Sequence, residues 1–157
     1  MLQIIQSKKI AAKGGHFAIV ASKYNARYVD AMLRAARAEI RRAGGTAQVV
    51  RGPGAYEIPV VAAHFARRAN IHGPHAILCL GVILRGATTH AQHIGEAVSN
   101  ALAQIQVKHE VPIIHEVLLL ENEQQARERC LDKKHNRGAE AAQTALEMAR
   151  VMKVLRA

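Results

Sequence analysis

Apolar runs of strand length alternate along the chain with stretches of helical periodicity. The runs lie at 16–22, 47–51, 75–84 and 111–120. Between and after them, apolar residues recur every three or four positions, as they do on one face of a helix. Strands that alternate with helices pair in parallel through right-handed crossovers, with helices on both faces of the sheet. The pattern therefore predicts an α/β protein, a three-layer α/β/α sandwich around a parallel sheet with one strand for each run.

Helices are predicted over 28–43, after residue 57, over 89–108, from about residue 122 and from about residue 138. The spacing of apolar residues also predicts which side of a helix is buried. For the second and third helices, the predicted buried sets are Ile58, Ala62, Phe65 and Ala69, and Ile94, Val98, Ala101 and Ile105.

Polar or glycine-rich segments follow three of the predicted strands. "KYN" comes after the first, "GPGAYE" after the second and "RGATTH" after the third. Ligands of parallel α/β sheets bind beyond the carboxyl ends of the strands. The topology therefore predicts that these three segments converge on one site.

The segment "RGATTH" has the composition of an anion site next to a proton-transfer group. Gly86 lets the backbone approach a ligand or turn sharply. Thr88 or Thr89 is expected to cap the next helix, whose free N–H groups favour a phosphate. His90 lies in the first turn of that helix and can transfer protons near neutral pH. The alternative is an ordinary strand–turn–helix connection, and Arg85 is either a phosphate ligand or a structural ion-pair partner.

The other two segments also carry two interpretations each. Glu57 lies in the first turn of a helix, where the helix dipole favours a carboxylate. It either stabilises that helix or accepts ligand hydroxyls beside exposed N–H groups of Gly54 and Ala55. Tyr24, which precedes Asn25, either stacks on a planar ring or packs a loop.

Several kinds of site lack their sequence signature. The motifs GxGxxG, GxxxxGK[ST] and GxSxG do not occur, which disfavours a dinucleotide site, a P-loop and a hydrolase elbow. His93 shares a helix face with His90, but no third metal ligand is evident nearby. We therefore expect no metal site, and we expect His93 to face outward.

The composition of the chain indicates a cellular compartment and gives its net charge. Of 157 residues, 50% are hydrophobic and 3% aromatic, so the core must be aliphatic. The two cysteines fit a reducing compartment, and neither a secretory signal nor a long apolar span is present. These features predict a soluble cytoplasmic protein of one domain. The net charge of +10 fits either solvated basic faces, an anionic small-molecule site or a nucleic-acid partner, although no nucleic-acid-binding motif accompanies it.

Taken in order, six segments resemble the 6,7-dimethyl-8-ribityllumazine synthase family. They are "IVASKYN", "GPGAYEIP", "LGVILRGATTH", "VPII", "EQQARER" and "NRGAEAA", and the resemblance runs from "IIQ" to "ALEMA". It implies a flavodoxin-like sheet, one domain over 1–157 with an N-terminal arm over 1–14, and a transferase of riboflavin biosynthesis. Such an enzyme condenses 5-amino-6-(D-ribitylamino)uracil with 3,4-dihydroxy-2-butanone 4-phosphate, releases phosphate and water, and needs neither metal nor cofactor.

The resemblance also assigns residues to a substrate pocket. Those implied to hold the pyrimidine ring and the ribityl chain are Tyr24, Asn25, Gly54, Ala55, Glu57, Ile83 and Leu84. Those implied to bind the phosphate are Gly86, Ala87 and Thr88. His90 matches the proposed proton-transfer histidine of the family.

A second group of residues implies a site shared between subunits. Arg129 matches an arginine that reaches the phosphate from a neighbouring subunit, and Lys133 and Arg137 fall at basic positions of the same site. His115, followed by Glu116, stands where the family commonly has an aromatic residue and a glycine, so it either stacks weakly or marks an altered ring pocket. The resemblance implies pentamers, alone, paired or in a sixty-subunit shell, and "LQIIQ" resembles a segment that adds a strand to a neighbour's sheet.

Two other functions fit the same sequence. A non-catalytic assembly or flavin-binding protein would use the same scaffold, since a fold does not dictate an activity. A basic nucleic-acid binder would use the net charge of +10 instead.

Overall fold

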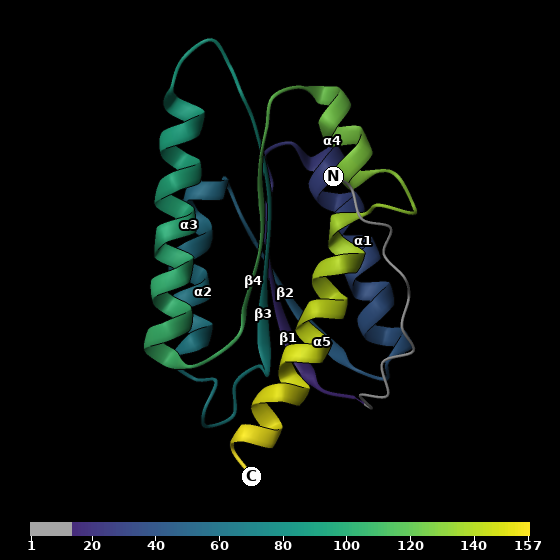
Figure 1. Ribbon diagram of the computed structural model, residues 1–157, viewed down its shortest axis with the longest axis vertical. Coiled ribbons are helices and arrows are strands. Elements are labelled where there is room, and N and C mark those ends of the chain that lie inside the picture. The colour runs from purple at the N-terminus through teal and green to yellow at the C-terminus, as the bar shows by residue number, and fades with distance from the viewer. Residues whose placement is uncertain (1–13) are drawn as a thin grey trace.

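The computed structural model describes residues 14–157, and helices cover both faces of its central sheet (Figure 1). The strands are β1 (His16–Ser22), β2 (Thr46–Gly52), β3 (Ala76–Leu84) and β4 (Ile113–Leu120). The 4-stranded sheet has the order β2-β1-β3-β4, and all neighbouring strands are parallel. The predicted three-layer sandwich and the flavodoxin-like class are confirmed. The "LQIIQ" segment and all but the last residue of the expected N-terminal arm lie within residues 1–13, outside the described part of the chain.

The helices divide between the two faces of the sheet (Figure 1). On one face lie α1 (Ala26–Arg42), α4 (Glu123–Cys130) and α5 (Arg137–Leu155). On the other lie the short η1 (Ala55–Glu57), α2 (Ile58–Ala66) and α3 (His90–His109). Among residues 14–157, no helix combines the length and the apolar content needed to span a membrane.

Two apolar layers hold the sandwich together, one on each face of the sheet. Successive strand side chains point to opposite faces, so Phe17 and Ile19 of β1 pack under α1 and α5, while Ala18 and Val20 pack under α2 and α3. Strand β3 is buried along all but its last residue. Its uninterrupted apolar run is what a central strand covered on both faces requires.

Two predicted helix faces differ from those observed. Helix α2 ends at Ala66, so Ala69 lies in the following turn and not on the helix. In α3 the predicted Ala101 is only partly buried. The buried residues of α3, which packs against both α2 and β4, are Ala91, Val98 and Leu102, so Val98 is buried as predicted and Leu102 takes the place of Ala101.

The strand order creates a topological switch point between β1 and β3. After β1 the chain crosses one face of the sheet through α1 to β2, whereas after β3 it crosses the other face through α3 to β4. The two connections leave in opposite directions, which opens a crevice at the carboxyl ends of β1 and β3. At this edge, uppermost in Figure 1, the connection from β3 to α3 rises above the sheet.

Candidate active site

A pocket of about 650 Å³ lies at this switch point, and we call it the switch-point pocket. The three segments that follow β1, β2 and β3 all contribute to it, as the topology predicts. Its lining residues are Tyr24, Asn25, Gly54, Ala55, Tyr56, Glu57, Val82, Ile83, Leu84, His90, His93, Ile94 and Ala97.

Asn25 lines the pocket and links the segment after β1 to β3. It precedes α1 in the left-handed conformation, with φ 56° and ψ 40°, which asparagine tolerates better than most residues. Its side chain makes no cap bond to α1 and instead donates from Nδ2 to the carbonyl oxygen of Val82 at 2.7 Å. Asn25 therefore fixes the pocket's geometry.

The Tyr24 ring lies across the backbone of Gly54 and remains 68% exposed. A Cβ atom placed on Gly54 would come within 2.9 Å of Tyr24 Cδ2, so only glycine allows this approach without a shift of the ring. Tyr24 thus packs a loop on one side, and enough of its surface is exposed to stack on a planar ligand.

Glu57 has the stabilising role that the sequence left open, and one of its carboxylate oxygens takes no part in it. Its Oε2 accepts a hydrogen bond from the Gly54 N–H at 2.9 Å, the reciprocal contact of a capping box. The N–H of Gly54 is therefore not free for a ligand, contrary to the expectation. Within residues 14–157, no hydrogen bond involves the second carboxylate oxygen of this exposed side chain, so that oxygen can accept a ligand hydroxyl.

The segment from Gly86 to Thr89 connects β3 to α3 and is exposed, but none of its four residues lines the pocket. A Cβ atom on Gly86 would meet no atom within 4 Å, so the backbone there is open to a ligand. Thr89 occupies the N-cap position of α3 but its side chain makes no cap bond. Thr88 makes only a long contact, its Oγ1 lying 3.4 Å from the His90 nitrogen. The predicted threonine cap is therefore weak, which leaves N–H groups at the start of α3 for other partners.

Both histidines at the start of α3 line the pocket. His90 is exposed and begins the helix, as expected. His93 is exposed too, but it lines the pocket, which the sequence interpretation did not assign to it. Together with Ile94 and Ala97 it follows His90 at helical spacing, and that spacing was the signal available in the sequence.

Arg85 is an ion-pair partner of residues in its own chain. Its Nη1 lies 2.9 Å from Glu121 Oε1, and its Nη2 donates to Gln92 Oε1 at 3.0 Å. Of the two roles that the sequence left open, the structure supports the structural one.

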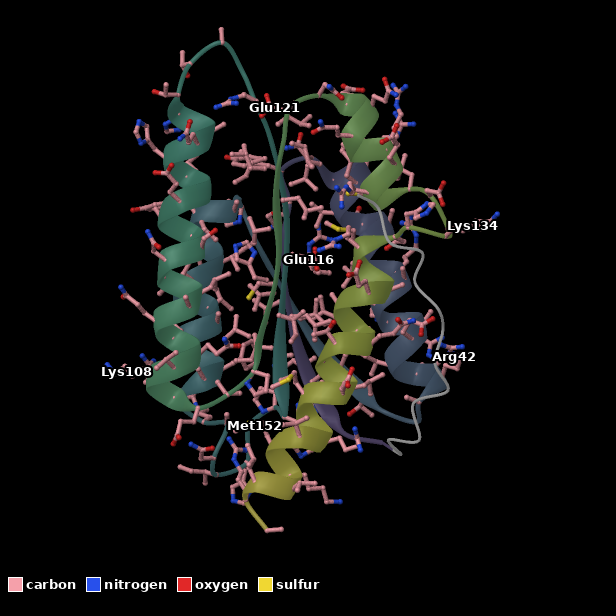
Figure 2. All side chains as sticks on the ribbon, in the orientation of Figure 1. Arg42, Lys108, Glu116, Glu121, Lys134 and Met152 are labelled. Carbon is pink, nitrogen blue, oxygen red and sulfur yellow. The ribbon has the colours of Figure 1, made fainter. Side chains whose placement is uncertain are left out.

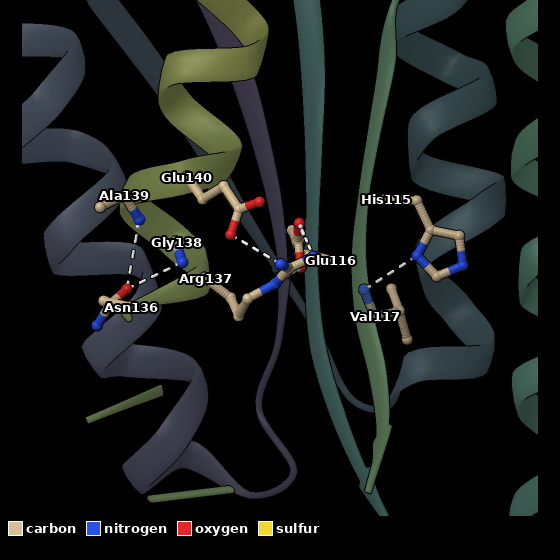
Figure 3. Close-up of polar contacts among 8 residues, drawn as sticks. All are labelled: His115, Glu116, Val117, Asn136, Arg137, Gly138, Ala139 and Glu140. Carbon is tan, nitrogen blue, oxygen red and sulfur yellow. Dashed lines mark hydrogen bonds and ion pairs between the residues drawn. The ribbon is translucent and has the colours of Figure 1, made fainter. Parts of the chain in front are cut away.

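His115 and Glu116 on β4 point to opposite faces of the sheet (Figure 3). His115 lies on the α3 side, where its Nε2 is 2.7 Å from Ser99 Oγ. Its Nδ1 accepts from the Val117 N–H at 3.2 Å, which assigns the ring proton to Nε2. Partial burial lowers the pKa of His115 below its ordinary value, so both observations favour the neutral ring.

Glu116, only 5% exposed, lies between the sheet and α5 (Figure 2). Arg137 donates to its two oxygens from Nε and Nη2, both at 3.0 Å, and to Glu140 from Nη1 at 2.7 Å (Figure 3). We call Glu116, Arg137 and Glu140 the β4–α5 cluster. Burial raises the pKa of Glu116 to about 7, against the opposing effect of Arg137.

The β4–α5 cluster gives Arg137 a role that the sequence did not reveal. All three guanidinium nitrogens bind carboxylates of the same chain. Glu116 and Arg137 are 21 positions apart in the sequence, so no local pattern signals their pairing. An arginine held in this way does not have the free fork that binds a phosphate.

The remaining predicted residues lie away from the switch-point pocket. His115, Arg129 and Arg137 line a second cavity, of about 510 Å³, along β4. Lys133 is exposed in the connection between α4 and α5. None of these four residues lines the pocket that contains His90, and Lys133 lines neither cavity.

The comparisons with known proteins agree on one family. The family model described as 6,7-dimethyl-8-ribityllumazine synthase matches residues 14–153. The protein of that name from Aquifex aeolicus (strain VF5) is 40% identical over 155 residues, which cover 97% of this chain and 99% of the relative. That from Stenotrophomonas maltophilia (strain R551-3) is 36% identical over 146 residues, or 91% of this chain and 92% of the relative. The similarity therefore spans both the switch-point pocket and the β4–α5 cluster.

Proposed function

Because this chain belongs to the 6,7-dimethyl-8-ribityllumazine synthase family, whose members are enzymes of riboflavin biosynthesis, we propose that it condenses 5-amino-6-(D-ribitylamino)uracil with 3,4-dihydroxy-2-butanone 4-phosphate. The reaction releases phosphate and water. The observation that carries the proposal is the switch-point pocket, where an exposed Tyr24 ring, an exposed Glu57 carboxylate and the His90 imidazole line one cavity.

The pocket has a separate surface for each part of the amine substrate. In this proposal the pyrimidine ring stacks on Tyr24 and contacts the apolar Ile83 and Leu84, which line the same cavity. The ribityl hydroxyls bind the unpaired oxygen of Glu57 and the backbone of Ala55. Asn25 holds the floor of the pocket through its bond to Val82.

In this proposal, the connection between β3 and α3 binds the phosphate, and His90 at its end carries out the proton transfers. The open backbone from Gly86 to Thr88 and the N–H groups at the start of α3 suit an anion. The amine attacks the ketone carbonyl, and water leaves as the imine forms. Loss of a C–H proton next to the imine then lets phosphate leave, and the ribitylamino nitrogen attacks the carbonyl that results, with loss of a second water, to close the ring. These steps move protons at nitrogen, oxygen and carbon, which is the work we assign to His90 at the pocket edge.

A homopentamer completes the site in this proposal. Arg129 and Lys133 lie outside the pocket of their own chain and are at least partly exposed, so they are available to the pocket of a neighbouring subunit. The sheet with its two apolar layers supports one domain over 1–157. The two buried, unpaired cysteines support a reducing, cytoplasmic location. Native mass spectrometry would distinguish a pentamer from paired pentamers and from a sixty-subunit shell.

An enzymatic assay tests the proposed reaction. The purified full-length protein is mixed with the two substrates, and formation of the fluorescent lumazine is followed over time. We expect turnover well above the uncatalysed condensation. A protein that is correctly assembled by native mass spectrometry but gives only the background rate would contradict the proposal.

A further inference from the structure

A chain of polar side chains crosses the carboxyl edge of the sheet, with Arg85 at its centre. Arg85 bonds Glu121 at 2.9 Å on one side and Gln92 at 3.0 Å on the other. Gln92 donates onward from Nε2 to Glu96 Oε1 at 2.9 Å. The N–H of Glu121 donates to Gln125 Oε1 at 2.9 Å. These contacts join the end of β3 to α3, to the end of β4 and to α4.

The Arg85 side chain bridges the two ends of the loop over residues 86–89. Arg85 is the residue before the loop, and its N–H extends the sheet by donating to the Leu120 carbonyl at 2.8 Å. Gln92 lies in the first turn of α3, just beyond the loop. The loop's own contacts are few: Thr88 Oγ1 lies 3.4 Å from the His90 nitrogen, and the Thr89 carbonyl accepts from the His93 N–H at 3.2 Å. The loop is therefore held chiefly at its ends.

Arg85 lies on the opposite flank of α3 from the switch-point pocket. It lines a groove of about 510 Å³ together with Gln92 and Glu96. His90 and His93 line the pocket instead. The guanidinium thus faces away from a substrate in the pocket of its own chain, and any effect on that substrate must pass through the loop.

We propose that Arg85 is a positioning residue, which holds the loop over 86–89 and His90 in place for the phosphate-bearing substrate by bridging Glu121 and Gln92. The identity of that substrate rests on the proposed function. Backbone donors bind an anion well only when their geometry is set in advance, and small displacements of such groups have large kinetic effects. The Arg85 and Glu121 side chains are 38% and 53% exposed. Ion pairs as exposed as this one contribute little to stability, so a contribution to folding does not explain why Arg85 bridges Glu121 and Gln92.

The sharpest test removes the partner and keeps the arginine. In Glu121→Ala the guanidinium loses one anchor but remains charged. If Arg85 positions the loop, KM for the phosphate substrate should rise about 5-fold to 10-fold. If Arg85 were itself a phosphate ligand, releasing it from a carboxylate should lower KM instead, and that result would overturn the proposal.

Two substitutions of Arg85 separate its shape from its charge. Arg85→Met should raise KM for the phosphate substrate by about 10-fold, with a smaller change in KM for the pyrimidine. Arg85→Lys should behave almost as Arg85→Met does, because a lysine presents one nitrogen and cannot bridge two acceptors. Full rescue by lysine would show that charge alone matters and would overturn the proposal. Arg42→Met, which breaks the exposed Arg42–Glu39 pair on α1, is the matched control and should leave both KM values unchanged.

A measurement without substrate keeps this inference separate from the proposed function. Amide hydrogen exchange at Arg85 and His93, whose N–H groups bond the Leu120 and Thr89 carbonyls at the two ends of the loop, should be at least about 5-fold faster in Glu121→Ala than in the parent chain, while exchange over 54–57 stays the same. If the variant exchanges faster but the parent protein has no lumazine synthase activity, the positioning role of Arg85 is supported and the proposed reaction is refuted. If exchange and KM are both unchanged in an active enzyme, only the positioning role is refuted.

Discussion

Most polar side chains in the switch-point pocket are exposed, whereas those of the β4–α5 cluster are buried or partly buried and are paired. In the pocket, Glu57 uses one oxygen for a backbone contact, and His90 begins a helix at the edge of the cavity. In the cluster, Glu116 and Arg137 satisfy each other through two bonds of 3.0 Å. Both regions carry residues that the family resemblance assigned to a substrate site. The difference indicates that charge is available to a ligand in the pocket and is committed to the fold in the cluster.

The largest expected effect is on stability, in the cluster. At pH 8, where Glu116 is ionised, Arg137→Met leaves this buried carboxylate without its partner, which should lower the free energy of unfolding by about 3 kcal/mol. The double variant Glu116→Met with Arg137→Met removes both charges and should return to within about 1 kcal/mol of the parent. Denaturant unfolding monitored by circular dichroism would measure both.

The same double variant separates a structural Arg137 from a ligand. We expect its KM for the phosphate substrate to match that of the parent chain. A clear increase in that KM, in a double variant of normal stability, would show that Arg137 contacts the substrate.

The next effect is on the rate, in the pocket. His90→Ala should lower kcat about 100-fold, the usual contribution of a positioned acid–base group, and should leave stability unchanged because the side chain is exposed. Steady-state kinetics and thermal unfolding measure the two quantities. His72→Ala, an exposed histidine in the turn before β3, is the control. A His90→Ala enzyme with the parent's kcat would remove His90 from the mechanism.

A smaller effect is expected where the Tyr24 ring meets the backbone. Gly54→Ala places a Cβ atom 2.9 Å from Tyr24 Cδ2 and 3.0 Å from Glu57 Oε2, so the ring must shift. KM for the pyrimidine substrate should rise about 10-fold, since a misplaced contact weakens binding without touching the reacting atoms. Gly52→Ala adds a Cβ atom at an ordinary 3.9 Å from Glu57 Cβ and should bind the pyrimidine normally. Equal KM values for the two variants would contradict the stacking role of Tyr24.

A second effect on stability is the pH dependence that Glu116 introduces. Burial raises the pKa of this carboxyl from 4.5 to about 7, so the folded protein holds a proton that the unfolded chain has released. Its contribution to stability is fully present below about pH 4.5 and is lost as the pH rises through about 7. We expect Glu116→Gln to remove roughly 2 to 3 kcal/mol of the decline in unfolding free energy between pH 5 and pH 8. Identical pH profiles for the two proteins would refute this assignment.

Most of the fold was predictable because periodicity is a local property of the chain. The apolar run over 75–84 predicted β3 as a strand covered on both faces, and it is buried along almost its whole length. The shift of the buried line in α3 from Ala101 to Leu102 was not predictable, since it depends on α2 and β4 packing against the same helix.

Some residues of the candidate site were also predictable from the sequence, and others were not. The segments with Tyr24, Glu57 and His90 were placed together by one rule, that parallel strands present their carboxyl ends at a common edge. His93 was missed although its helical spacing from His90 was visible. The pairing of Glu116 with Arg137 had no local signal, because the two residues are brought together by α5 packing on the sheet.

The sequence by itself determined the order of strands and helices, the aliphatic core and the three segments that form the switch-point pocket. It did so because hydrophobic spacing and turn residues act over a few positions along the chain. Only the tertiary structure decided which charges remain available. Arg85 is held by Glu121 and Arg137 by Glu116. An arginine's role depends on which carboxylate the fold brings within hydrogen-bond distance, and elements far apart in the sequence set that distance.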